Sequence, residues 1–175
     1  EQRTGSPETC KLPKQKQSSN KYRRFFEDSP VALWEEDFTE LQLHMEDLRQ
    51  QGVHDLEDYL HQHPTEIVAM ADMIRVLDVN QEALNLLGAS SKSELTGRIG
   101  KLFSSSSIRA FRLELIEIWK GSTHFSLEGI NRTLDGRDLH LLFRFQTSPI
   151  GKIPNNNIYL LALTDITDRM EAEKK

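Results

Sequence analysis

An apolar run, residues 158–163, lies near the end of the chain and is followed directly by polar residues. A run of this kind predicts a strand that is covered on both faces and lies near the middle of a sheet. The polar residues that follow it have a good helix-forming composition. The pattern therefore predicts a buried strand that leads into an exposed, charged helix. Because this helical pattern has no stop signal, we expect a further part of the protein beyond Lys175.

Two further strands are predicted before this one, over residues 124–133 and 138–147. Between them, Asp135 and Gly136 form a dipeptide typical of a two-residue type I′ hairpin turn. Apolar residues alternate along the second strand, which predicts that one face carries Leu139, Leu141, Phe143 and Phe145. The pattern predicts three antiparallel strands at the end of the chain.

Helical spacing of apolar residues predicts helices earlier in the chain. Asn80 is a good N-cap and Gly88 a good C-terminal stop for a helix between them. A longer helix is predicted before Gly121, with four residues facing inward: Ile108, Phe111, Leu115 and Ile118. Short strands are predicted at 31–34 and 74–79.

Residues 37–73 are predicted to form an acidic, helical insertion. Asp37 and Glu40 have the spacing of a capping box, so Glu36 and Asp37 are expected at the start of its first helix. Gly52 and Pro64 divide the segment into three helices. Between residues 35 and 72 there are eleven acids and one basic residue, which argues against nucleic acid as a partner.

The N-terminal region has the opposite charge. Residues 1–20 are rich in Gln, Ser, Lys and Pro, which predicts a disordered tail, and a short helix is expected over residues 21–28. Tyr22, Phe25 and Phe26 form an aromatic cluster on this helix. With a net charge of −5 and 37% hydrophobic residues, the chain as a whole is typical of one domain preceded by a polar linker.

Several kinds of chemistry have no support in the sequence. Cys10 is the only cysteine, so an internal disulfide and a cysteine-based metal site are excluded. His61 and His63 stand two apart and do not share a helix face, which favours surface residues over metal ligands. No nucleophile elbow, phosphate loop or membrane span is present, so we expect no catalytic residue, no metal, no membrane contact within this chain and a cytoplasmic location.

The chain resembles a PAS sensor domain. The resemblance rests on residues 26–34, Val79-Asn80 with residues 83–88, Asp135-Gly136 and, most specifically, Asp165-Ile166-Thr167 with Arg169. It covers roughly residues 22–170 and departs from typical members at the helical insertion, which a subset of bacterial sensor kinase input domains shares. It implies an α+β fold: a five-stranded antiparallel sheet with helices on one face and the first strand paired with late strands.

The resemblance also implies domain boundaries and a function. Residues 1–20 would be the tail, 21–170 the PAS domain and 171–175 the start of an output helix. The domain would act as a cytoplasmic signal-input module for a C-terminal output domain, first of all a histidine kinase. The alternative is a ligand-free dimerisation module of a diguanylate cyclase or a transcription regulator. The Asp-Ile-Thr junction, residues 165–167, would transmit the signal, with Asp165 and Arg169 paired as neighbours four apart.

The expected interior is apolar and can be either a packed core or the wall of a pocket. Haem and flavin are not expected, because residues 105–120 contain no histidine and residues 80–103 no cysteine. If a ligand binds, we expect it to be small and apolar or amphipathic, and not a nucleotide or a sugar. A homodimer is expected through both ends of the domain. The predicted pocket residues are Trp34, Val76, Leu87, Phe111, Leu115, Ile118, Phe125, Leu127, Leu141, Phe143, Phe145 and Leu163.

Overall fold

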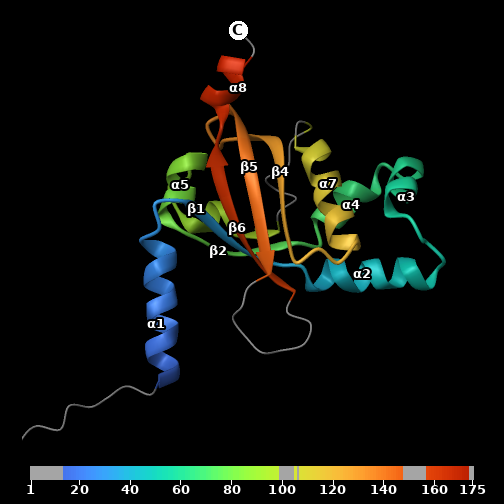
Figure 1. Ribbon diagram of the computed structural model, residues 1–175, viewed down its shortest axis with the longest axis horizontal. Helices are drawn as coiled ribbons and strands as arrows, with labels where there is room; N and C mark the ends of the chain where they lie inside the picture. The colour runs from blue at the N-terminus through green and yellow to red at the C-terminus, as the bar shows by residue number, and fades with distance from the viewer. Residues whose placement is uncertain (1–13, 99–104, 106, 148–156, 174–175) are drawn as a thin grey trace, which may run out of the picture.

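The computed structural model describes residues 14–98, 105, 107–147 and 157–173. The strands are β1 (Ala32–Asp37), β2 (Arg75–Val79), β3 (Gly97–Arg98), β4 (His124–Arg132), β5 (Asp138–Thr147) and β6 (Ile158–Asp165). The helices are α1 (Lys14–Glu27), α2 (Thr39–Gln50), α3 (Leu56–Gln62), α4 (Glu66–Ala71), α5 (Gln81–Leu87), α6 (Lys92–Leu95), α7 (Ile108–Trp119) and α8 (Thr167–Glu173). In Figure 1, α1 and α8 extend away from the sheet in different directions.

The strands form one antiparallel sheet in the order β3-β2-β1-β6-β5-β4. The predicted α+β fold class is confirmed, and the first long strand pairs with the last, with Trp34 opposite Leu161. The sheet has one strand more than the five predicted, because the two-residue β3 adds to its edge beside β2. This order places the first and last strands, β1 and β6, side by side at the centre of the sheet.

Strand β1 extends three residues beyond its predicted end at Trp34. Its six residues pair with β6, and side chains alternate along it, so that Ala32, Trp34 and Glu36 are buried. Helix α2 therefore begins at Thr39, after Asp37. The expected capping box is wrong, although the Asp37 carboxylate accepts a hydrogen bond of 2.8 Å from the Thr39 N–H. Pairing with β6 outweighed the local helix-start signal.

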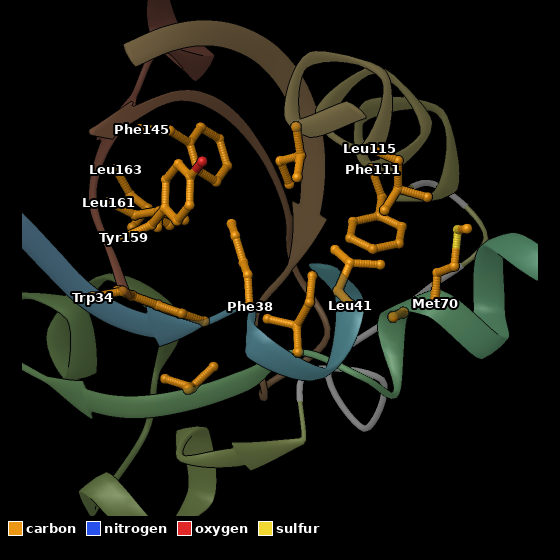
Figure 2. Packing of buried hydrophobic residues seen from close by; sticks show 14 of the residues in the cluster. Trp34, Phe38, Leu41, Met70, Phe111, Leu115, Phe145, Tyr159, Leu161 and Leu163 are labelled. Atoms are coloured by element: carbon orange, nitrogen blue, oxygen red, sulfur yellow. The ribbon is translucent and has the colours of Figure 1, made fainter. Parts of the chain in front are cut away.

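The predicted insertion consists of α2, α3 and α4, and each helix buries one face. The buried residues are Leu41, Met45, Leu48, Leu56, Leu60, Ile67, Met70 and Ala71. Figure 2 shows Leu41 of α2 and Met70 of α4 pointing toward Phe111 and Leu115 of α7. These side chains belong to one continuous hydrophobic core, and Leu41, Met70 and Leu115 are fully buried. One side of α7 is therefore covered by the inserted helices.

Asn80 joins three elements at the start of α5. Its Oδ1 accepts hydrogen bonds from the N–H groups of Leu33 (2.9 Å) and Ala83 (3.0 Å). Its Nδ2 donates to the carbonyl oxygens of Phe26 (3.1 Å) and Val31 (2.8 Å). The predicted N-cap is thus also the point at which α5 is attached to β1 and to the end of α1.

The turn between β4 and β5 differs from the predicted two-residue loop. The Gly136 N–H donates to the Thr133 carbonyl oxygen at 3.0 Å, so the turn spans Thr133–Gly136. Gly136 closes this turn with a φ of 90°, a left-handed conformation that glycine adopts without strain. Asp135 and Gly136 are therefore the last two residues of the turn and not its two central residues.

Three other predictions need correction. In β6, Tyr159, Leu161 and Leu163 are buried, but the alternate residues 158, 160 and 162 are only half-buried, so one face is incompletely covered. Helix α1 begins at Lys14, which makes residues 14–20 helical where a disordered tail was expected. Helix α8 begins at Thr167, four residues before the expected start of the output helix at residue 171.

Candidate functional site

A cavity of about 50 Å³ lies between α7 and the inner face of the sheet. Strands β1, β4, β5 and β6 each contribute to its wall. The space is small: at roughly 10–15 Å³ per water it holds about four water molecules, or a ligand with a similar number of heavy atoms. Its lining residues are Trp34, Glu36, Ser107, Ala110, Phe111, Glu114, Leu127, Ile130, Asn131, Phe143, Phe145, Leu161 and Leu163.

Six of the twelve predicted pocket residues line this cavity: Trp34, Phe111, Leu127, Phe143, Phe145 and Leu163. The other six do not line the cavity and lie elsewhere in or against the same continuous hydrophobic core: Val76, Leu87, Leu115, Ile118, Phe125 and Leu141. Leu115 shows why spacing could not separate the two groups. It faces inward from α7 as predicted, but toward the inserted helices (Figure 2).

Glu36 places an acid in a wall that was expected to be uncharged. It follows Trp34 by two residues in β1, so both side chains lie on the inner face of the sheet, toward the core. Its exposure is 0%, and among the described residues neither carboxyl oxygen has a hydrogen-bond partner. Because burial disfavours the charged form, the pKa of Glu36 is raised to about 8. Glu36 is therefore mostly protonated at neutral pH.

Glu114 is the second acid, and it comes from α7. It stands four residues after Ala110 and seven after Ser107, so that these three residues share one side of the helix. Glu114 is 7% exposed, and its Oε1 has no partner in the part of the chain that the structure describes. Burial raises its pKa well above the usual value, and the negative charge of Glu36 raises it further.

The two acids share one apolar space, and this decides what the site can do. Two carboxyl groups with raised pKa hold protons near neutral pH and are available to donate or accept hydrogen bonds. No described residue lining the cavity is a lysine, arginine or histidine. The other polar residues of the wall, Ser107 and Asn131, are 3.2 Å apart and connect α7 with β4, with the Ser107 hydroxyl donating to Asn131 Oδ1.

Continued alternation could have identified Glu36, because a strand that buries Trp34 also buries the residue two positions on. Glu114 had a comparable signal in its helical spacing from Phe111. For Leu161, the alternation of β6 was the signal. Nothing in the local sequence indicated that Ile130 and Asn131 would reach the cavity, because that depends on how β4 packs against α7.

The junction between β6 and α8 contains the predicted residues in a different arrangement. Asp165 accepts a hydrogen bond of 2.8 Å from the Thr167 N–H, and it does not pair with Arg169. Arg169 Nη2 lies instead 2.6 Å from Glu128 Oε1 of β4. The predicted Asp165–Arg169 pair is therefore wrong, since the helix-start bond occupies Asp165 and β4 offers Arg169 a closer carboxylate.

Two further contacts attach the start of α8 to β5. The Ile166 N–H donates to the His140 carbonyl oxygen at 2.8 Å. The His140 N–H donates to the Thr167 hydroxyl at 3.0 Å, and the Ile166 side chain is 8% exposed. Helix α8 is thus bound to β5 through its first turn and to β4 through Arg169.

The remaining candidate chemistry lies outside the cavity. Within the described ranges there is no group of three or more His, Cys, Asp or Glu residues able to hold a metal ion. His63 stacks on Tyr59, with ring centroids 4.4 Å apart. His44 Nε2 lies 3.5 Å from a carboxylate oxygen of Glu66. No described helix has the length and apolar character needed to cross a membrane.

Comparisons with known proteins agree on the architecture. Residues 56–121, from α3 through α7, match the family model described as PAS domain. The structure of an RNA-binding Light-Oxygen-Voltage receptor is similar, with 16% identity and a TM-score of 0.59, over 97% of this chain and 39% of that chain. The fold is that of a PAS domain. The matched segment includes α3 and α4, so part of the helical insertion lies inside the PAS match.

Two further solved structures support this assignment of the fold. The PAS domain of a protein from Colwellia psychrerythraea has 14% identity and a TM-score of 0.57, over 87% of this chain and 99% of that chain. The PAS domain of the fruit-fly ELK potassium channel has 11% identity and a TM-score of 0.53, over 86% and 97%. A comparison with curated proteins found no match. This chain spans less than half of the Light-Oxygen-Voltage receptor.

Proposed function

We propose that this PAS domain is a signal-input module in which the occupant of the cavity controls the position of α8. One observation carries the proposal. Leu127 of β4 lines the cavity, and the next residue, Glu128, binds Arg169 of α8 on the other side of the strand. Because side chains alternate across a strand, β4 contacts the cavity with one face and α8 with the other.

The packing of β4 against α7 supports transmission by displacement. A Cβ atom placed on Gly129 would lie 2.4 Å from the Cβ of Ala110, so the two backbones approach closely here. A group that exceeds the cavity volume of about 50 Å³ must therefore displace α7, β4 or both. Since β4 also holds Arg169, such a shift changes the contact that orients α8.

The PAS resemblance supports a further step, in which α8 connects to an output domain. A histidine kinase is our first candidate, in a cytoplasmic protein, and the PAS domain itself acts without catalysis. The volume of the cavity favours a ligand much smaller than haem or flavin. The ligand site thus comprises the lining residues given above, and the junction comprises residues 165–167 with Arg169.

The test is hydrogen exchange of the α8 amides in variants of the isolated domain. Leu127→Phe fills part of the cavity without touching the junction, and we expect it to change the exchange rates of residues 167–173. Glu128→Gln removes the ion pair with Arg169 directly, so it shows how much the α8 exchange rates change when this contact is lost. Leu43→Phe is the matched control, because Leu43 lies on α2 with 64% of its side chain exposed. Identical α8 exchange in Leu127→Phe and wild type would overturn the proposal.

A second candidate function, ligand-free dimerisation, is favoured by the surface of α1. Phe25 is 67% exposed on this helix, although it lies next to the buried Phe26. An exposed aromatic side chain of this kind is typical of a contact with a second copy. Sedimentation should show a dimer that weakens in Phe25→Ser but not in Leu43→Ser. A monomer at all concentrations in wild type would exclude dimerisation by this chain alone.

A further inference from the structure

Three buried carboxyl oxygens face the space around the cavity without a partner. Both oxygens of Glu36 and Oε1 of Glu114 have no hydrogen bond among the described residues. Buried polar atoms in proteins are almost always paired, so each exception needs a physical explanation. Burial raises the pKa of both acids, the charge of Glu36 raises that of Glu114 further, and both residues line the same small space. The Trp34 Nε1 donor of the same wall is also buried without a partner among the described residues. The three carboxyl oxygens therefore define a site for a group that donates hydrogen bonds, beside one N–H that can donate to a further partner.

The walls indicate the charge of the missing partner. An anion would meet two acids and no described lysine, arginine or histidine in the lining. A cation would allow at least one carboxyl group to ionise, because an opposite charge compensates for its lost hydration. The aromatic side chains in the wall add to this preference, since the faces of such rings attract cations.

The number of unpaired carboxyl oxygens and the cavity volume indicate which kind of cation fits the site. A primary ammonium group has three N–H donors and no acceptor, which matches the three open oxygens once the cation has displaced the carboxyl protons. The cavity volume of about 50 Å³ leaves room for only a short chain beside it. The rest of the wall includes Leu127, Phe143 and Phe145, which suit an alkyl group. A planar guanidinium group has five donors, more than the open oxygens accept.

We propose that this cavity binds a small primary alkylammonium ion, with its ammonium group between the carboxyls of Glu36 and Glu114 and its alkyl group against Phe143 and Phe145. The proposal rests on the proposed function in taking this cavity as the input site. It narrows the sequence expectation of a small apolar or amphipathic ligand to a cationic amphipathic one, because two acids line the wall. It also explains why two acids are buried here although their unpaired carboxyl oxygens contribute no hydrogen bond that stabilises the fold.

Protons compete with such a ligand, so the neighbouring titratable groups matter. Tyr159 of β6 has a raised pKa. Burial is the larger cause, and the negative charge of Glu114 is the second. The Tyr159 hydroxyl itself donates to the Ser122 carbonyl oxygen at 3.3 Å. From β1 and α7, Glu36 and Glu114 are the titratable groups in the described lining. Because Glu36 holds its proton up to about pH 8, binding should tighten as the pH rises toward that value and weaken as the pH falls.

The experiment titrates the domain with n-propylammonium chloride and follows the backbone amides by NMR near neutral pH. The matched probes are n-propanol, which has the same size without the charge, and propionate, which has the opposite charge. We expect saturable shifts in α7 and β4 with n-propylammonium, binding of n-propanol weaker by about tenfold or more, and none of propionate. Equal binding of n-propylammonium and n-propanol would overturn the ammonium proposal.

Two variants test the acids directly. Glu36→Gln and Glu114→Gln should each weaken n-propylammonium binding by about tenfold or more, because each removes a charge-assisted acceptor. Glu35→Gln is the matched control, because it makes the same change one residue away on the other face of β1. Thermal unfolding checks that every variant is folded. Unchanged binding in both acid variants, or no shift with any probe because only water fills the cavity, would overturn the inference.

The outcomes separate this inference from the proposed function. If n-propanol binds as well as n-propylammonium and α8 exchange responds to Leu127→Phe, the input role stands and the ammonium site is wrong. If n-propylammonium binds through Glu36 and Glu114 but α8 exchange never changes, the ligand site stands and the input role is wrong. If neither measurement responds, both are overturned.

Discussion

The Asn80 junction and the cavity around Glu36 place polar side chains inside the same apolar core in opposite ways. Asn80 is fully buried and has four hydrogen bonds, two accepted and two donated. Glu36 is equally buried and has none among the described residues. A satisfied amide holds elements together, whereas an unsatisfied acid costs stability and leaves its atoms available to a partner. The difference separates a structural residue from a candidate binding residue.

The largest expected effect is the pH dependence that Glu36 gives to stability. Its pKa rises from 4.5 to about 8 on folding, so between these values the folded protein holds a proton that the unfolded chain has lost. The stabilising contribution is therefore greatest below about pH 4.5 and is lost as the pH rises toward 8. The expected slope is roughly 1.4 kcal/mol per pH unit for one group.

Urea denaturation of wild type and Glu36→Gln across this pH window isolates the effect from other titrating groups. Glutamine cannot ionise, so the difference in the free energy of unfolding should change steadily with pH in favour of the variant. Parallel curves for the two proteins would mean that Glu36 is not buried in its uncharged form. Glu35→Gln, on the other face of β1, is the comparison: partial burial and then the charge of Asp78 also raise the pKa of Glu35, so the slope should change in the same direction but by less than in Glu36→Gln.

Next in size is the loss of the Asn80 junction. Asn80→Ala leaves two N–H groups and two carbonyl oxygens without their partner, so the free energy of unfolding should fall by about 3 kcal/mol. Asn85→Ala on the exposed side of α5 should change it by less than about 0.5 kcal/mol. Similar values for the two variants would show that Asn80 does not hold the junction, and the comparison with Glu36 would fail.

A smaller loss is expected where β4 meets α7. Gly129→Ala would place a Cβ 2.4 Å from that of Ala110, which forces the strand and the helix apart. Overpacking of this kind costs about 1–3 kcal/mol. Combining it with Ala110→Gly should restore much of the loss, because the opposing methyl group is then absent. If the double variant is no more stable than Gly129→Ala, this contact is not the cause.

The smallest effect on stability is expected at the output junction. Arg169 and Glu128 are about half exposed, with side-chain exposures of 49% and 50%, so Arg169→Gln should cost no more than about 1 kcal/mol. The α8 amides should nevertheless exchange faster, because the contact with β4 is lost. A global loss of several kcal/mol would mean that Arg169 supports the fold. Unaltered α8 exchange would show that the ion pair does not restrain the helix.

Local patterns in the sequence determined a large part of this protein. The spacing of Leu41 and Met45 in α2, the cap at Asn80 and the left-handed stop at Gly88 each depend on neighbours within one or two turns of helix. The alternation in β5 likewise predicted the burial of Leu139, Leu141 and Phe145, although Phe143 is only half-buried. The PAS-like order of elements followed from these signals, and half of the predicted pocket residues do line the cavity.

Only the tertiary structure decided which inward-facing residues line a cavity and which fill the core. Leu115 and Phe111 follow the same helical period, but Phe111 borders the cavity while Leu115 packs among the inserted helices. Pairing with β6 placed Glu36 in the wall, and the approach of β4 to α8 gave Arg169 its partner Glu128. These contacts join residues far apart in the chain, so their energies depend on how strands and helices meet. Alternation along β1 can indicate that Glu36 is buried, but no local pattern of hydrophobic and polar positions indicates which residues will meet.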